Sequence, residues 1–189
     1  RSGARLIGRS APAGARQDAS FNPQHVPARD EQFRLGAATL RAIDTPGHAS
    51  NHVCYLLEQE GLLFSGDHVL DGVTPVILAP DGDMTDYLES LRRLKSYPLV
   101  AIAPGHGGVL AQPFTVIDSI IAHRGAREAK VVAALARLAA PTTDELLASV
   151  YDDVSPRLHE FARCTLEAHL LKLEREGRCR RQGERWLAA

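Results

Sequence analysis

The sequence predicts an α/β fold followed by a small helical unit that ends in a β-hairpin. Short apolar runs up to residue 64 have the length and alternation of β-strands. An amphipathic helical pattern at 87–97 lies between two such runs. Because a strand, helix, strand order brings the two strands into one sheet, we expect a parallel or mixed sheet covered by helices.

Composition excludes several classes of protein. Of the 189 residues, 44% are hydrophobic and 24% are charged, and the net charge of −1 gives no overall attraction to nucleic acid or anionic membranes. No apolar run reaches the roughly 18 residues that span a bilayer, so we expect no membrane partner. Three cysteines without a CxxC pair argue against a disulfide framework and a thiolate zinc site. They favour a reducing, cytoplasmic location, and Cys54, inside a strand pattern, should be in the core.

The first half of the chain predicts a loop region and then strands. Residues 1–36 are interrupted by Pro and Gly too often for a long helix or a central strand. We expect strands at 39–43, 53–57 and 62–64, the last two joined as a hairpin. The strand at 53–57 is apolar on both faces, which predicts burial on both sides.

The helix at 87–97 carries its leucines at helical spacing, with Thr85 as the expected N-cap. Pro98 should end it, and the chain should return to the sheet at 99–103. A long helix is predicted at 115–139, starting on the body of the protein and reaching to the next unit. We divide the chain at this point into a domain at 1–139 and a second domain at 140–189.

The second domain has the pattern of a winged helix. Thr142 and Glu145 form a capping box that opens a short helix. A second helix should begin at Ser155-Pro156 and end at Gly177. Residues 178–187 alternate around a Gln-Gly turn and predict a hairpin whose Trp186 packs on the helix. The helical residues expected to contact it are Leu166, Leu170 and Leu173.

Three stretches carry the chemistry: Thr45-Pro46-Gly47-His48, Ser65-Gly66-Asp67-His68 and Ala103-Pro104-Gly105-His106-Gly107. Each follows an apolar run and presents a His or an Asp at the end of a predicted strand. Imidazole and carboxylate ligands suit zinc, and a carboxylate can bridge two ions. The spacings of 19 and 39 residues are too long for one local site, so a fold must gather them. We predict that His48, Asp67 and His106 ligate metal around one centre, and that Asp67 is also catalytic.

Other interpretations remain open for single residues. Each ligand candidate alone could be a turn residue satisfied by a backbone partner, whereas three in one context favour a metal site. His52 and His68 flank the ligands. They could hydrogen-bond to the ligands, face the substrate, or have only a structural role. Loop aspartates usually cap helices and turns, which is the expectation for Asp44, Asp71, Asp81 and Asp83. The remaining histidines are expected at the surface or an interface: His25, His123, His159 and His169.

At these motifs the chain resembles the metallo-β-lactamase superfamily of hydrolases, most closely the subgroup with a C-terminal winged helix. The resemblance implies the C-terminal part of an αβ/βα sandwich, with a short strand near 5–8. It implies two zinc ions, Asp67 bridging them, His48 on one and His106 on the other. The family's His-x-His-x-Asp-His signature does not occur in these 189 residues. We therefore expect an incomplete part of a longer enzyme, which alone binds zinc weakly or not at all and is inactive.

By this resemblance the complete protein is a hydrolase that uses a metal-activated water on an ester, thioester or phosphodiester. Its partners would be a small-molecule ester or thioester, or single-stranded RNA. The alternative is a non-catalytic module whose winged helix contacts nucleic acid or a protein on a degenerate scaffold. Residues 141–189 hold eight basic and nine acidic side chains, which favours a structural, substrate-shielding or dimerising role and leaves a homodimer open. Residues 172–185, with six basic and three acidic, leave a weak RNA contact by the wing open.

Overall fold

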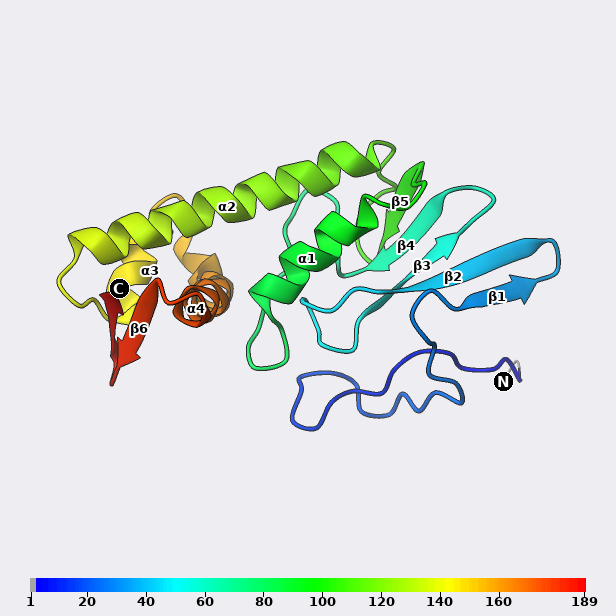
Figure 1. Ribbon diagram of the computed structural model, residues 1–189, viewed down its shortest axis with the longest axis horizontal. Coiled ribbons are helices and arrows are strands. Elements are labelled where there is room, and N and C mark those ends of the chain that lie inside the picture. Colours follow the sequence, from blue (N-terminus) through cyan, green and yellow to red (C-terminus); the bar gives the residue numbers. More distant parts are fainter. Residues whose placement is uncertain (1–2) are drawn as a thin grey trace.

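The computed structural model describes residues 3–189, in which one mixed five-stranded sheet forms the body (Figure 1). The strands lie in chain order, and the first four are antiparallel neighbours. The fifth pairs parallel to the fourth, which confirms the predicted mixed sheet and the hairpin at 53–64. The strands are β1 (Gln32–Leu35), β2 (Ala38–Asp44), β3 (Val53–Leu57), β4 (Leu62–Gly66) and β5 (Ala101–Pro104).

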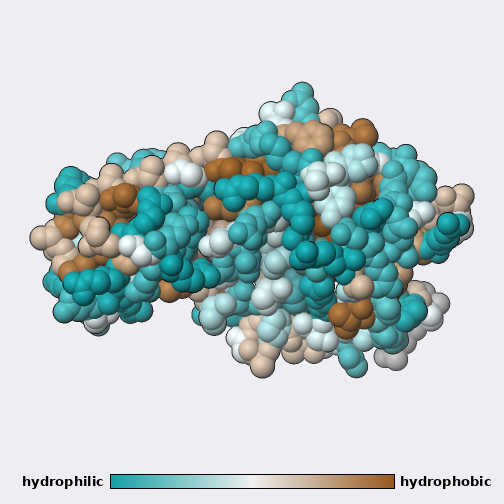
Figure 2. All heavy atoms as spheres, viewed as in Figure 1, coloured by the Kyte–Doolittle hydropathy of each residue, from teal (hydrophilic) through white to brown (hydrophobic). Residues whose placement is uncertain are grey.

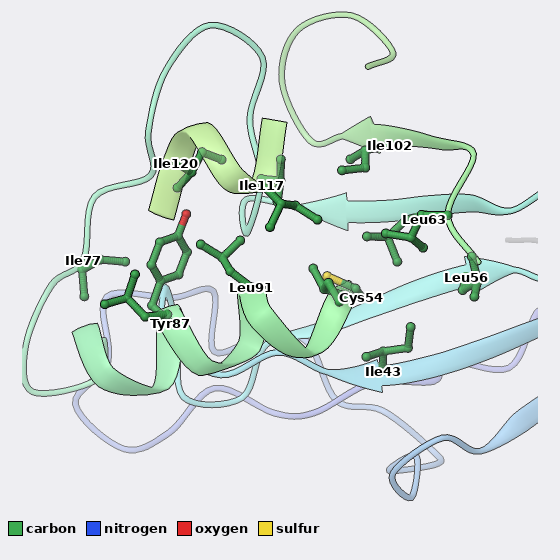
Figure 3. Close-up of a cluster of buried hydrophobic side chains, with 14 of the residues drawn as sticks. Ile43, Cys54, Leu56, Leu63, Ile77, Tyr87, Leu91, Ile102, Ile117 and Ile120 are labelled. Atoms are coloured by element: carbon green, nitrogen blue, oxygen red, sulfur yellow. The ribbon is translucent and has the colours of Figure 1, made fainter. Parts of the chain in front are cut away.

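Helices α1 (Met84–Leu94) and α2 (Pro113–Arg137) cover one face of this sheet (Figure 1). The core lies between them, where aliphatic side chains of the strands meet those of the helices (Figure 3). Cys54 is fully buried there, as predicted, and burial raises the pKa of its thiol to about 12. Apolar contact across this layer is what holds the helices to the sheet.

The N-terminal loop segment lies along the other face of the sheet (Figure 1). Along β3, Val53, Tyr55 and Leu57 are half-buried, and the Tyr55 hydroxyl donates to the Ile7 carbonyl at 3.2 Å. The prediction that this strand is buried on both faces is therefore wrong, because helices pack on one side alone. The prediction of a strand near 5–8 is also wrong, because that stretch forms only an isolated β-bridge, between Ile7 and His25.

The N-cap of α1 is Asp83, not Thr85 as predicted. Asp83 has an extended backbone, and its Oδ1 accepts from the backbone N–H groups of Thr85 and Asp86 at 2.8 and 3.0 Å. Thr85 already lies inside the first turn, so its own N–H is one of the donors that need a cap.

Helix α2 joins two hydrophobic cores, as its predicted length suggested. Ile117 and Ile120 pack in the core of the body, whereas Val131 and Leu135 pack in a second cluster with the C-terminal helices. Its observed bounds differ by two residues from the predicted 115–139. The division of the chain into domains at 139 and 140 stays a prediction.

The C-terminal unit has the predicted helices and hairpin. Both hydrogen bonds of the capping box between Thr142 and Glu145 are present. Trp186 is buried in one cluster with the leucines predicted to contact it, and its backbone N–H donates to the Pro141 carbonyl. The elements are α3 (Thr143–Val150), the short 3-10 helix η1 (Pro156–Leu158), α4 (His159–Arg175), β6 (Cys179–Gln182) and β7 (Arg185–Ala188).

His169 on α4 corrects another expectation. It was assigned to the surface or an interface, but its side chain is fully buried where α4 packs against α2. Its Nδ1 lies 3.4 Å from Oε2 of Glu128, but neither ring nitrogen has a hydrogen-bond partner within residues 3–189.

Hydrophilic side chains cover most of the face shown in Figure 2 on both units, with separate apolar patches between them. Among the helices that the structure describes, none combines the length and the apolar character needed to cross a bilayer.

Candidate metal centre

One edge of the sheet carries all the candidate ligands. Asp67 directly follows β4, and His106 comes two residues after the end of β5. His48 and His52 lie in the loop that connects β2 to β3. Because β4 and β5 are parallel and β2 is antiparallel to β3, these positions share the same edge. The topology therefore gathers residues that are distant in sequence.

Asp67 and His106 approach each other directly. Nε2 of His106 lies 3.6 Å from Oδ1 of Asp67, and the backbone N–H of Gly105 donates to the Gly66 carbonyl at 2.8 Å. A Cβ atom on Gly105 would lie 2.7 Å from Oδ1 of Asp67, so a larger residue would displace the carboxylate. Both side chains are exposed enough to reach a bound ion.

His48 is oriented by the main chain of a distant loop. Its Nδ1 lies 2.8 Å from the carbonyl oxygen of Val76, which can only accept, so Nδ1 carries the proton. This leaves the lone pair of Nε2 free, which is the state of a metal-binding histidine. The neighbouring Gly47 has φ +135°, and a Cβ there would lie 2.2 Å from Cα of Tyr87. Only glycine fits this turn against α1.

His52 lies on the same pocket as His48 and Asp67. The pocket has a volume of about 430 Å³ and is also lined by Gln17 and Asn51. Nδ1 of His52 lies 2.8 Å from the Thr45 hydroxyl. Burial, and then the nearby His48, lower the pKa of His52 to about 4, so its ring is neutral at pH 7.

His68 lies behind His52 in the core. Its ring centroid is 5.5 Å from that of His52 and 4.9 Å from that of Tyr87, and its side chain is fully buried. Within residues 3–189, neither ring nitrogen has a hydrogen-bond partner. Burial holds its pKa well below the ordinary value, so the ring is neutral and does not line the pocket.

The donor types fit zinc, but they do not form a closed ligand set. In the part of the chain that the structure describes, no three or more His, Cys, Asp or Glu side chains are grouped closely enough to hold a metal ion. The structure brings Asp67 to His106, and places His48 and His52 with Asp67 on one pocket. Their ligation of a common metal centre stays a prediction.

Three aspartates near the pocket have polar partners, although Asp44 is the last residue of β2 and does not cap a helix or a turn. Asp44 pairs with Arg9, Asp81 accepts from the hydroxyl and backbone N–H of Ser50, and Asp71 accepts from the backbone N–H of Gly108. These bonds tie the loops around the pocket to one another.

Gln17 was missed by the sequence analysis. Its side-chain Nε2 donates to Oδ1 of Asn51 at 3.0 Å and to Oδ2 of Asp81 at 2.7 Å, which places the N-terminal loop at the pocket. Nothing in the Gly-, Ala- and Pro-rich sequence around Gln17 distinguishes it. Asn51 could have been suspected from its place between His48 and His52.

Comparison with known proteins agrees with this architecture. Residues 3–106 match the Metallo-beta-lactamase superfamily, and residues 142–186 match the Beta-lactamase associated winged helix domain. The chain belongs to the metallo-β-lactamase superfamily and carries the winged helix associated with it.

Two curated relatives illustrate the match. The Beta-lactamase-like protein 2 homolog of Drosophila melanogaster is 32% identical over 158 residues, covering 82% of this chain and 52% of that protein. Thioesterase pkgB of Emericella nidulans is 40% identical over 113 residues, covering 60% of this chain and 32% of that protein. The chain thus spans about half or less of the length of these relatives.

Solved structures show the same fold. A metallo-beta-lactamase family protein from Thermus thermophilus superposes with a TM-score of 0.76 at 30% identity, covering 89% of this chain and 55% of that one. A Beta-lactamase domain protein from Burkholderia ambifaria gives a TM-score of 0.79 at 24% identity, covering 90% and 54%, and supports the fold alone.

Proposed function

We propose that this chain provides His48, Asp67 and His106 to a binuclear zinc hydrolase that cleaves thioesters or related esters. The observation that carries the proposal is the meeting of Asp67 and His106 at the carboxyl ends of two parallel strands, 3.6 Å apart. Membership of the superfamily, and relatives named as thioesterases, support hydrolysis and this substrate class.

Zinc, when bound, would lower the pKa of a water molecule and polarise the scissile carbonyl. The side chains of this chain prepare the site for it. The Val76 carbonyl fixes the tautomer of His48, and the close approach of Gly105 fixes the carboxylate of Asp67. Asp67 would bridge the ions, while His48 and His106 would each bind one of them.

Thioester is favoured over single-stranded RNA by charge as well as by the relatives. The winged-helix unit at 141–189 carries eight basic and nine acidic residues, whereas a nucleic-acid-binding domain needs a strongly basic face. No specific observation favours the non-catalytic binding module.

The test is hydrolysis by the full-length protein after zinc loading, over a panel of thioester, lactone, lactam and single-stranded RNA. We expect thioester cleavage that follows zinc content and falls by about 100-fold or more in Asp67→Asn. The matched control is Asp118→Asn, an exposed carboxylate on α2 that pairs with Lys95. Unchanged activity of the Asp67 variant, or cleavage of RNA alone, would refute the proposal.

A further inference from the structure

A groove begins in the body beside the candidate metal centre, between the loop after β4 and α2, and continues to the winged-helix unit. It consists of two adjoining pockets of about 520 and 300 Å³, which share Val73, Thr74 and His123. Asp71 lines the first pocket and accepts from the backbone N–H of Gly108, two residues after His106. The volumes are in the range of small-molecule sites. We call these two pockets together the interdomain groove.

The rim of the interdomain groove is unusually apolar. Val73 from the loop after β4, Leu158 from η1 and Phe161 from α4 are 62%, 51% and 55% exposed. Large apolar side chains exposed together around a cavity are typical of a site that binds an apolar group. The three residues come from separate elements, so the fold brings them together.

A buried positive charge without a counter-ion lies in the lining of the second pocket. Arg124 of α2 is 3% exposed, and its guanidinium donates to the Pro75 carbonyl and lies 5.7 Å from the centre of the Tyr87 ring. Its Nε has no hydrogen-bond partner among residues 3–189, and no carboxylate of that range forms an ion pair with it. Burying an unpaired charge is costly, so a ligand that supplies a negative charge would stabilise this arginine.

Arg127, one turn further along α2, shows the contrast. It also lines the pocket and is nearly buried, but it donates to the Val150 carbonyl and pairs with Asp153 at 2.7 Å. Burial, and then Arg124 and Arg127, lower the pKa of His123 between the two pockets. Arg127 therefore has a counter-ion, whereas Arg124 has none among residues 3–189.

Tyr151 adds a second donor without an acceptor. Its side chain lines the same pocket, and its buried hydroxyl has no partner within the described part of the chain. Burial raises its pKa to about 12, so the hydroxyl keeps its proton and can donate. Two buried donors, one of them charged, call for an acceptor with negative charge.

We propose that the interdomain groove binds an acyl chain that carries a carboxylate. The apolar chain contacts Val73, Leu158 and Phe161, and the carboxylate accepts from Arg124 and Tyr151. A single unpaired guanidinium matches the single charge of a carboxylate. The use of this site to hold the acyl group of a substrate rests on the proposed function, whereas binding itself does not.

The experiment is calorimetric titration of the 189-residue chain with octanoate and, separately, with 1-octanol. We expect saturable one-to-one binding of octanoate with a dissociation constant of about 1 mM or tighter. The uncharged alcohol should bind at least about tenfold more weakly, because its hydroxyl can accept a hydrogen bond but has no negative charge to pair with Arg124. Arg124→Met should remove this preference, lowering octanoate affinity by about tenfold without changing that of octanol.

Arg137→Met is the matched control, since it removes the same charge from α2 at a position outside the groove. Phe161→Asp tests the rim at an exposed position, where folding should persist, and should weaken octanoate binding by about tenfold through charge repulsion and lost apolar contact. If Arg124→Met does not fold, the octanoate affinity of Phe161→Asp tests the proposal instead.

Equal affinity for octanoate and octanol, no saturable octanoate binding, or a folded Arg124 or Phe161 variant with unchanged affinity would overturn the proposal. Thioester hydrolysis by the full-length protein is measured separately. Octanoate binding without hydrolysis would refute the proposed function alone, and hydrolysis without octanoate binding would refute the groove alone.

Discussion

His106 Nε2 and Asp67 Oδ1 lie 3.6 Å apart although 39 residues separate them in the chain. The parallel pairing of β4 and β5 produces this approach, and the hydrogen bond from the Gly105 N–H to the Gly66 carbonyl joins the ends of the two strands. A Cβ on Gly105 would lie 2.7 Å from Oδ1 of Asp67, so this approach leaves no room for a side chain there. The backbone of β4 and β5 therefore sets the distance between Asp67 and His106.

Gly47→Ala should destabilise the protein strongly. The residue has φ +135°, and the new Cβ would lie 2.2 Å from Cα of Tyr87 in a position that only backbone movement relieves. We expect a loss of about 2–4 kcal/mol in the free energy of unfolding, measured by urea denaturation. Gly125→Ala is the control: it lies within α2 with open space around it, and should gain about 0.5–1 kcal/mol. Similar effects of the two substitutions would contradict this account.

Local patterns predicted most of the fold. The capping box at Thr142 and the packing of Trp186 were expected correctly because they depend on neighbouring residues and on periodicity. The motifs around His48, Asp67 and His106 indicated one site because strand ends and glycine turns are visible in the sequence. The structure places all three at one edge of the sheet, and their ligation of one metal stays a prediction.

Long-range relationships were not predictable in this way. Residues on both faces of β3 are apolar, so the sequence does not indicate which face the helices cover. The face without helices is the half-buried one. The burial of His169 depends on Glu128, forty-one residues earlier on another helix. The unpaired Arg124 looks like any surface arginine until α2 packs against the loop at Pro75.

Asp83→Ala should cost about 1 kcal/mol of stability, because two backbone N–H groups of α1 lose their acceptor. Asp83 also pairs with Arg175 of α4, so the two effects must be separated. Asp83→Ser keeps a capping oxygen without the charge and should lose little, as should Arg175→Ala. Thermal unfolding of the three variants beside Thr85→Ala measures this. If Thr85→Ala were the most damaging, the assignment of the cap would be wrong.

Stability should fall with pH partly through Glu128. The His169 imidazole, together with Lys172, holds the pKa of this carboxyl at about 2, below its ordinary value of 4.5. Between these two values the unfolded chain binds a proton that the folded chain does not, so stability falls as pH drops from about 4.5 to about 2 and is fully present above 4.5.

The measurement is the urea midpoint between pH 6 and pH 2 for Glu128→Gln beside the parent. The variant should be less stable at pH 6 and should lose less as the pH falls, since it has no carboxylate to protonate. Glu60→Gln, in the exposed turn between β3 and β4, is the control and should follow the parent. Parallel curves for Glu128→Gln and the parent would contradict the assignment.

Zinc binding by the 189-residue chain alone should be weak. A hydrolytic zinc ion takes about three protein ligands and water, so two ions need roughly six, even with one carboxylate shared. With Asp67 shared between them, His48 and His106 leave each ion about two protein ligands.

We therefore expect no sub-micromolar zinc binding and no thioester hydrolysis from this chain, measured by calorimetric titration beside an activity assay. Asp67→Ala should change neither result, because the parent site is already too weak to measure. Tight binding of two ions, or hydrolysis that Asp67→Ala abolishes, would show that the chain completes its own ligand set. In that case His52 is the first residue to test by His52→Ala, since it lines the pocket of His48 and Asp67 and its Nε2 lies 3.0 Å from the position of a Cβ on Gly66.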